Sequence, residues 1–226
     1  MELVGETTLH NTKRKRSGNK ITSKEPNVGS SEKGKLQIQN VVASVSFDEE
    51  IDLEKVSAAF RDVESKDNFP GLVLRLKKPK ATILLFKSGK MVLTGLKRRE
   101  DAPVVVQKIF KRLADIDIKV ETQPNISIQN IVASGDLGKM IDLDSAATCL
   151  NNAIYEPEVF PGLILRREDP KACFLIFSSG KIVCTGMKEK KDIIMVVKEL
   201  ATTLKKMDLL IDLDQNQREL LEIMAD

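Results

Sequence analysis

The chain repeats a large part of its own sequence about 90 residues later, and this repeat limits its fold more than any other feature. The run Ile-Gln-Asn-Val-Val-Ala-Ser at 38–44 returns as Ile-Gln-Asn-Ile-Val-Ala-Ser at 128–134. Phe-Pro-Gly-Leu-Val-Leu-Arg at 69–75 returns as Phe-Pro-Gly-Leu-Ile-Leu-Arg at 160–166, and paired Ser-Gly-Lys and Thr-Gly motifs follow. The period is too long for a solenoid unit and predicts a duplicated half-domain. Two such halves form a quasi-two-fold surface, for which duplex DNA is a natural ligand.

The residue pattern of each half predicts the same order of strands and helices. In the first half we expect strands over 36–47, 72–77, 81–87 and 90–96, and helices over 53–62 and 101–114. In the second half we expect strands over 126–134, 163–168, 172–178 and 181–187, and helices over 143–153 and 191–207. Strands segregated from helices predict an α+β fold, in which helices cover one face of an antiparallel sheet.

Charge and composition divide the chain into four parts. Residues 1–35 carry eight Lys and Arg against four Glu, including the run Lys13–Arg16, and predict a disordered basic tail. The two halves follow over 36–119 and 120–207, and residues 208–226 form an acidic tail with six acids and one Arg. The two halves keep only a mild positive charge, which permits DNA binding without demonstrating it.

Alternation along the expected strands predicts one face that the helices leave uncovered. In 81–86, Ile83 and Leu85 point to the helices, whereas Thr82, Leu84 and Phe86 point away. This second set is too apolar for a solvated face and too polar for a core, so something must cover it. Asn and Thr among Val and Leu suit the A·T minor groove, with Arg and Lys at the flanks for phosphates. The alternative is that this face packs on another protein or on the chain's own tail.

The sequence argues against two classes of protein, an enzyme and a membrane protein. The only histidine, His10, lies in the basic tail, and the sequence has neither a Cys/His cluster for a metal nor a phosphate-binding loop. We therefore expect no catalysis, no metal and no cofactor. Cys149, Cys173 and Cys184 form no CxxC pair and predict reduced core residues of an intracellular protein. No signal peptide or membrane-length apolar run is found in the sequence, so we expect a soluble protein.

The paired Gln-Asn-(Val/Ile)-Val, Phe-Pro-Gly-Leu-x-Leu-Arg and Phe-x-Ser-Gly-Lys-x-Val-x-Thr-Gly motifs resemble the TATA-binding protein family over about residues 36–207. The resemblance implies a saddle of two pseudo-symmetric repeats, with a curved antiparallel sheet and helices on its convex face. It also implies a general transcription initiation factor that binds the minor groove of an A·T-rich promoter and bends it. A family-like adaptor that acts mainly through protein contacts is the alternative.

The resemblance also implies roles for individual residues. The residues that match the intercalating phenylalanines are Phe69, Phe86, Phe160 and Phe177. The matches to groove-contacting residues are Asn40, Val42, Leu84, Val92, Thr94, Asn130, Val132, Leu175, Val183 and Thr185. Arg75, Lys90, Arg166 and Lys181 match contacts to the DNA backbone.

The family also implies partners, namely a transcription factor B-like protein and RNA polymerase. Glu156 and Glu158 match the factor B contact, in a loop that Pro157 is expected to hold extended. Away from DNA, two copies of the chain could form a homodimer. Phe-Pro-Gly in both halves, the absence of a Gln-rich tract and the acidic end favour an archaeal type, located in the cytoplasm with the nucleoid. The Lys13–Arg16 run argues for the alternative, a nuclear protein.

Overall fold

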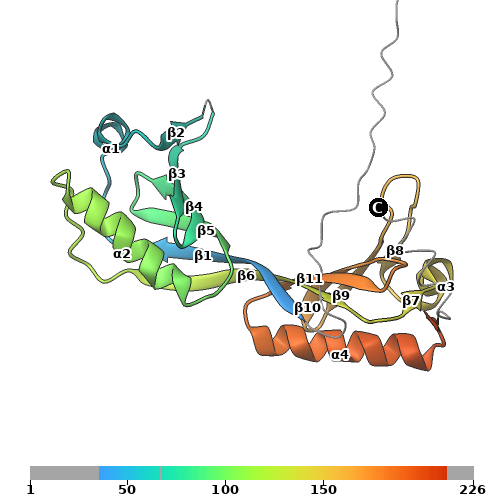
Figure 1. Cartoon of the computed structure of the whole chain (residues 1–226). Helices are drawn as coiled ribbons and strands as arrows, with labels where there is room; N and C mark the ends of the chain where they lie inside the picture. The colour runs from blue at the N-terminus through green and yellow to red at the C-terminus, as the bar shows by residue number, and fades with distance from the viewer. Residues whose placement is uncertain (1–35, 67, 213–226) are drawn as a thin grey trace, which may run out of the picture.

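The computed structural model describes residues 36–66 and 68–212, which form a long antiparallel sheet with helices on one side (Figure 1). The basic tail and residues 213–226 of the acidic tail lie outside the described residues, as do His10 and the Lys13–Arg16 run. Among the described residues no helix is both long and apolar enough to cross a membrane.

The first repeat begins with a strand, continues through a short helix and four strands, and ends in a long helix. Its elements are β1 (Gln37–Ser46), α1 (Leu53–Ala59), β2 (Val63–Ser65), β3 (Gly71–Lys77), β4 (Lys80–Phe86), β5 (Lys90–Leu96) and α2 (Asp101–Ala114). Helix α1 begins at the cap residue Asp52, whose side chain accepts a hydrogen bond from Lys55 N at 3.0 Å. Helix α2 buries Val105, Ile109 and Leu113, which lie four residues apart and therefore on one face.

The second repeat has the same order with two further short strands, one between its first strand and its short helix and one after its long helix. Its elements are β6 (Asn125–Asp136), β7 (Met140–Ile141), α3 (Leu143–Cys149), β8 (Ala153–Ile154), β9 (Leu163–Glu168), β10 (Lys171–Ile176), β11 (Lys181–Met187), α4 (Lys190–Lys206) and β12 (Leu210–Ile211). Asp142 caps α3 as Asp52 caps α1, accepting from Ser145 N at 3.0 Å. Strand β12 lies within the predicted acidic tail and pairs with β7.

Ten strands form one sheet in the order β2-β3-β4-β5-β1-β6-β11-β10-β9-β8, so the two repeats meet where β1 pairs with β6. The central pair is Val41 with Ile131, flanked by Asn40 opposite Val132 and by Val42 opposite Asn130. Equivalent residues thus lie on opposite sides of a local two-fold axis. The predicted quasi-two-fold surface follows directly from this register.

Helices α2 and α4 cover the same side of the sheet, one under each repeat (Figure 1). The core lies between them and the strands, where Val41, Ile83, Leu93, Phe174 and Cys184 are fully buried. We call the other side of the sheet the uncovered face. The predicted α+β fold with a two-repeat saddle is confirmed.

Several local predictions need correction. Helices expected over 53–62 and 143–153 end at Ala59 and Cys149, because the chain then turns into the edge strands β2 and β8. Of the three cysteines expected in the core, only Cys184 is buried, and burial raises the pKa of its thiol to about 12. Cys149 is exposed because α3 ends there and Leu150 packs against the core instead.

Candidate nucleic-acid interface

The centre of the uncovered face holds a hydrogen-bonded cluster around Asn40. Gly95 N donates to Asn40 Oδ1 at 2.7 Å, and Asn40 Nδ2 donates to Thr94 Oγ1 at 3.3 Å. Gly95 has φ +82°, a left-handed backbone that glycine adopts without strain, and lies where the β1–β5 pairing shifts register. The bulge therefore supplies the backbone N–H that orients the amide.

Asn130 has the same environment in the second repeat. Gly186 N donates to Asn130 Oδ1 at 2.9 Å, and Asn130 Nδ2 donates to Thr185 Oγ1, also at 2.9 Å. Because a backbone N–H occupies each amide oxygen, Nδ2 is identified as the donor side of both asparagines. Only one of the two N–H groups on each Nδ2 has a partner among the described residues. Each asparagine thus keeps a donor for a ligand, beside the threonine that the sequence predicted.

The glutamine that precedes each of these asparagines links the two repeats, and sequence reasoning missed both glutamines. The pairing of β1 with β6 skips Gln39 and Gln129, so each is a bulged residue. Gln39 Nε2 donates to Ser134 Oγ at 2.7 Å, and Gln129 Nε2 donates to Ser44 Oγ at 2.6 Å. Each bond crosses from one repeat to the other. Two polar residues in succession, Gln-Asn, interrupt the alternation of each strand, and this signal could have revealed the bulge.

Half-buried apolar side chains surround the polar centre. They are Val42, Leu84, Val92, Val132, Leu175 and Val183, which all lie on the uncovered face as predicted, none of them fully buried. Cys173 shares this face, in the position that Thr82 occupies in the first repeat. The face is therefore apolar with a few fixed donors.

The four predicted phenylalanines form one pair at each end of the face. The ring centroids of Phe69 and Phe86 are 5.6 Å apart, and those of Phe160 and Phe177 are 5.9 Å apart. The glycine of each Phe-Pro-Gly motif makes room for these rings, since a Cβ on Gly162 would lie 2.8 Å from Phe160 and 3.0 Å from Phe177. Phe177 is only 2% exposed, whereas the other three are partly exposed.

The predicted cations lie around the apolar area, but their surroundings differ. Lys90 is exposed and Lys181 is half-buried. Arg75 forms a bidentate ion pair with Glu64, with distances of 3.1 Å from Nε to Oε1 and 3.3 Å from Nη2 to Oε2. Arg166 is exposed and has no acidic partner in the described part of the chain. Within the described residues, Arg75 is therefore held in an ion pair, whereas Arg166 is not.

The loop before Phe160 is turned rather than extended as predicted. Glu156 O accepts hydrogen bonds from Val159 N and Phe160 N, both at 2.9 Å, because the chain reverses direction between β8 and β9. The turn leaves Glu156 and Glu158 exposed, together with Val159, which is 75% exposed. This loop thus presents two carboxylates and an apolar side chain to solvent.

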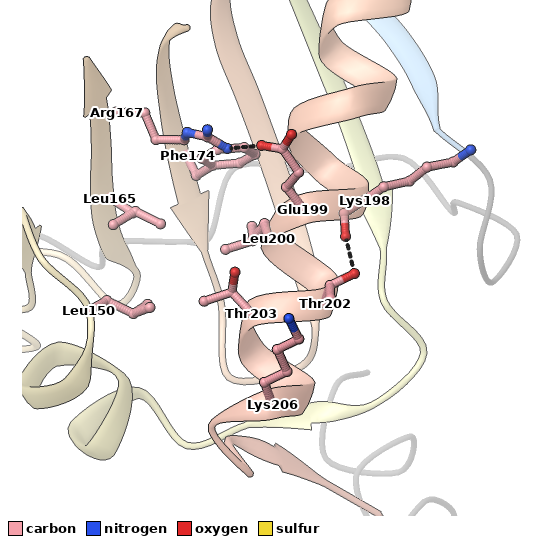
Figure 2. A pocket seen from close by; sticks show the side chains of 10 residues that line it. All are labelled: Leu150, Leu165, Arg167, Phe174, Lys198, Glu199, Leu200, Thr202, Thr203 and Lys206. Carbon is pink, nitrogen blue, oxygen red and sulfur yellow. Dashed lines mark hydrogen bonds and ion pairs between the residues drawn. The ribbon is translucent and has the colours of Figure 1, made fainter. Parts of the chain in front are cut away.

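The helix-covered side of the second repeat contains an open groove of about 520 Å³. Figure 2 shows it between α4 and strands β9 and β10, with an ion pair from Arg167 Nη1 to Glu199 Oε2 of 2.7 Å at one end. Leu165, Phe174 and Leu200 line its floor. The groove lies on the opposite side of the sheet from the asparagine clusters.

The fold and the uncovered face define a two-repeat saddle protein, and comparison with known proteins gives its family. The family model described as transcription factor TFIID, or TATA-binding protein, matches residues 35–116 and 125–207. The TATA-box-binding protein of Aeropyrum pernix is 46% identical over 180 residues, covering 79% of this chain and 89% of the relative. That of Sulfurisphaera tokodaii is 43% identical over 188 residues, covering 83% and 95%.

A solved structure gives the same result. The TATA-binding protein of Methanococcus jannaschii superposes with a TM-score of 0.71 at 44% identity, covering 76% of this chain and 99% of that one. The chain therefore belongs to the TATA-binding protein family. The family consists of DNA-binding transcription factors, so the prediction that the chain is not an enzyme is confirmed, as is the archaeal type.

Proposed function

We propose that this protein binds the minor groove of A·T-rich promoter DNA through its uncovered face, bends it, and so begins assembly of a transcription initiation complex. The relatives of Aeropyrum pernix and Sulfurisphaera tokodaii are named TATA-box-binding proteins. The observation that carries the proposal is the pair of Asn–Thr clusters on the local two-fold.

The chemistry of these clusters suits A·T pairs. The minor-groove edge of an A·T pair carries only acceptors, A N3 and T O2, whereas a G·C pair adds the guanine amine as a donor. The free N–H groups of Asn40 and Asn130 donate to those acceptors. A guanine amine at the same place meets a second donor, which costs on the order of 1–3 kcal/mol for each wrong pair.

The phenylalanine pairs supply the bend. An apolar wedge that enters a base step has an unstacking cost of about a few kcal/mol, offset because bent DNA follows more protein surface. Phe86 and Phe160 are already partly exposed, whereas Phe177 has to rotate out of its packing. In this proposal the two phenylalanine side chains of each pair move apart as the DNA kinks.

The loop over 155–160 is the proposed contact for the transcription factor B-like partner, which then brings RNA polymerase. Glu156 and Glu158 would pair with basic groups of the partner, while the exposed Val159 packs beside them. The equivalent place in the first repeat, Ser65–Asn68, has different chemistry. The two ends of the saddle therefore select different partners.

The test of DNA binding uses an A·T-rich duplex and a G·C-rich duplex with fluorophores at both ends, so that one titration reports affinity and bending. The wild type should bind the A·T-rich duplex and raise the energy transfer between its ends. Asn130→Ala should lower the preference for A·T by about tenfold or more, because one discriminating donor is lost. Phe160→Ala should lower both the energy transfer and the affinity.

The control for this titration is Glu199→Gln, which changes a side chain on the helix-covered side and should leave both quantities unchanged. An unaltered A·T preference in Asn130→Ala would overturn the role of the asparagines. Absence of DNA binding by the wild type would favour the adaptor alternative.

Partner recruitment is tested by Glu156→Arg combined with Glu158→Arg. Rim charge pairs are often worth less than about 1 kcal/mol singly, so reversing both gives a measurable effect. The double variant should bind DNA like the wild type but fail to form a ternary complex with a factor B-like protein in a gel shift. A normal ternary complex would exclude this loop and point to the basic residues Lys108, Lys111 and Arg112 of α2.

A further inference from the structure

Besides the loops, one pair of equivalent strand positions at the two ends of the uncovered face differs in charge. On β2, Glu64 lies opposite Val73 of β3, and on β8, Ile154 lies opposite Ile164 of β9. Val73 and Ile164 are equivalent in the two repeats, so Ile154 occupies the place of Glu64. The edge of the first repeat thus carries a carboxylate where the edge of the second carries an isoleucine that is 48% exposed.

Glu64 is positioned to hold Arg75. Both residues lie on the uncovered face, since Arg75 is two residues from Val73 on the same strand. The guanidinium donates from Nε and Nη2 to the two carboxylate oxygens, and the side chains are 57% and 49% exposed. Hydrogen bonds from Arg75 lower the pKa of Glu64, with a smaller contribution from Lys66, because the ion pair favours the charged carboxylate.

Arg166 has the same place in the second repeat without such a restraint. It lies opposite Cys173, as Arg75 lies opposite Thr82. The residue in the position of Glu64 is Ile154, which cannot accept a hydrogen bond. Arg166 is therefore ready to meet a phosphate, whereas Arg75 must first leave a carboxylate that itself repels phosphates.

We propose that Glu64 is a positioning residue that restrains Arg75, so that the first repeat binds the DNA backbone more weakly than the second. The inference rests on the proposed DNA-binding function and deepens it. A quasi-symmetric saddle that held both halves of a duplex equally would have no direction of its own. This ion pair gives the two ends unequal strength, and the stronger end is the one next to the loop with Glu156 and Glu158.

The test measures affinity for an A·T-rich duplex at several salt concentrations. Glu64→Gln keeps the shape of the side chain but removes its charge, and should raise affinity about two- to fivefold, the range expected for an exposed ion pair. It should also steepen the plot of log K against log salt by up to about one, because Arg75 becomes free to displace a counterion. Ile154→Glu should do the opposite by giving Arg166 the same partner.

Two comparisons separate this mechanism from a general charge effect. Glu199→Gln removes a matched carboxylate from an Arg–Glu pair on the helix-covered side and should change neither affinity nor slope. In an Arg75→Ala background, Glu64→Gln should lose most of its effect, since Glu64 acts through Arg75. A gain of the same size in both backgrounds means simple repulsion and overturns the proposal.

The same experiment distinguishes a failure of this inference from a failure of the proposed function. If the wild type does not bind the A·T-rich duplex, the proposed function fails. If the wild type binds and Glu64→Gln matches it in affinity and slope, only this inference fails. Both substituted side chains are exposed on edge strands, and thermal unfolding curves that match the wild type verify that the variants are folded.

Discussion

The two repeats share nearly identical residues on the uncovered face but fill the space beneath their long helices differently. In the first repeat, Arg112 of α2 stacks on Phe60, with its guanidinium carbon 4.2 Å from the ring centroid. The same Arg112 donates from Nη1 to Asp62 Oδ2 at 3.0 Å. The equivalent residues of the second repeat are Thr203, Leu150 and Asn152, which cannot form this arrangement, and the open groove of Figure 2 lies there.

This difference shows which side of the sheet tolerates change. On the uncovered face each repeat must offer the same polar centre to a ligand with two-fold symmetry, so Asn, Thr and Gly stand at equivalent places. On the helix-covered side no ligand fixes the residues, so packing tolerates different combinations of side chains and, in the second repeat, an open groove. The repeats therefore diverge where packing alone decides the residue.

The largest expected effect compares one leucine in each repeat. Leu74 is fully buried, whereas the equivalent Leu165 lines the open groove and is 7% exposed. Leu74→Ala should destabilise the fold by about 3–5 kcal/mol because it leaves an enclosed cavity. Leu165→Ala should cost about 1–2 kcal/mol less, since water or neighbouring side chains can fill the widened groove.

The measurement for this pair is urea unfolding followed by circular dichroism, with equal denaturant slopes as a condition for comparing the two free energies. Equal losses for the two variants would show that the groove does not relax the second repeat. In that case the comparison between a filled and an open repeat would fail as an account of stability.

A smaller effect is expected from the Arg112–Asp62 pair and should depend on pH. The hydrogen bond from Arg112 lowers the pKa of Asp62. A carboxyl group whose pKa is lower in the folded state stabilises the fold above its unfolded pKa, near 4, and loses this contribution as pH falls through the folded value. Because Asp62 is largely exposed, Asp62→Asn should cost under about 1 kcal/mol at pH 7 and less at pH 3.

Unfolding of the wild type and Asp62→Asn at both pH values measures this effect. The matched control is Asp62→Asn in an Arg112→Ala background, where the carboxylate has lost the partner that lowers its pKa and the cost should lose this pH dependence. A pH-independent cost for Asp62→Asn would show that Arg112 stabilises the first repeat by stacking on Phe60 rather than through its charge.

Much of the fold could be predicted because local patterns carry it. The bounds expected for the helix over 101–114 and for the strands over 163–168 and 181–187 agree with α2, β9 and β11. In each case a clear period of apolar residues lies between Gly, Pro or charged residues. The pairing between the two-residue strands Leu210–Ile211 and Met140–Ile141 was not predicted. Neither dipeptide has a local sequence signal that marks it as a strand.

The candidate site was predictable to a similar degree. Asn40 and Asn130 were placed beside Thr94 and Thr185, and the structure brings them together as expected. The restraint on Arg75 was not foreseen, because a three-residue strand with one glutamate has no pattern that marks it as part of the face.

The duplication, the two faces of each strand and the residues that the helices leave uncovered can all be read from the amino-acid sequence, because they are periodic properties of the chain. The folded chain is needed to see that Gln39 reaches Ser134 of the other repeat, that Glu64 holds Arg75 and that Phe177 is buried. These contacts join residues through strand register, bulges and packing. Periodicity along one strand says which face a side chain shares, but not which partner the neighbouring strand brings to it.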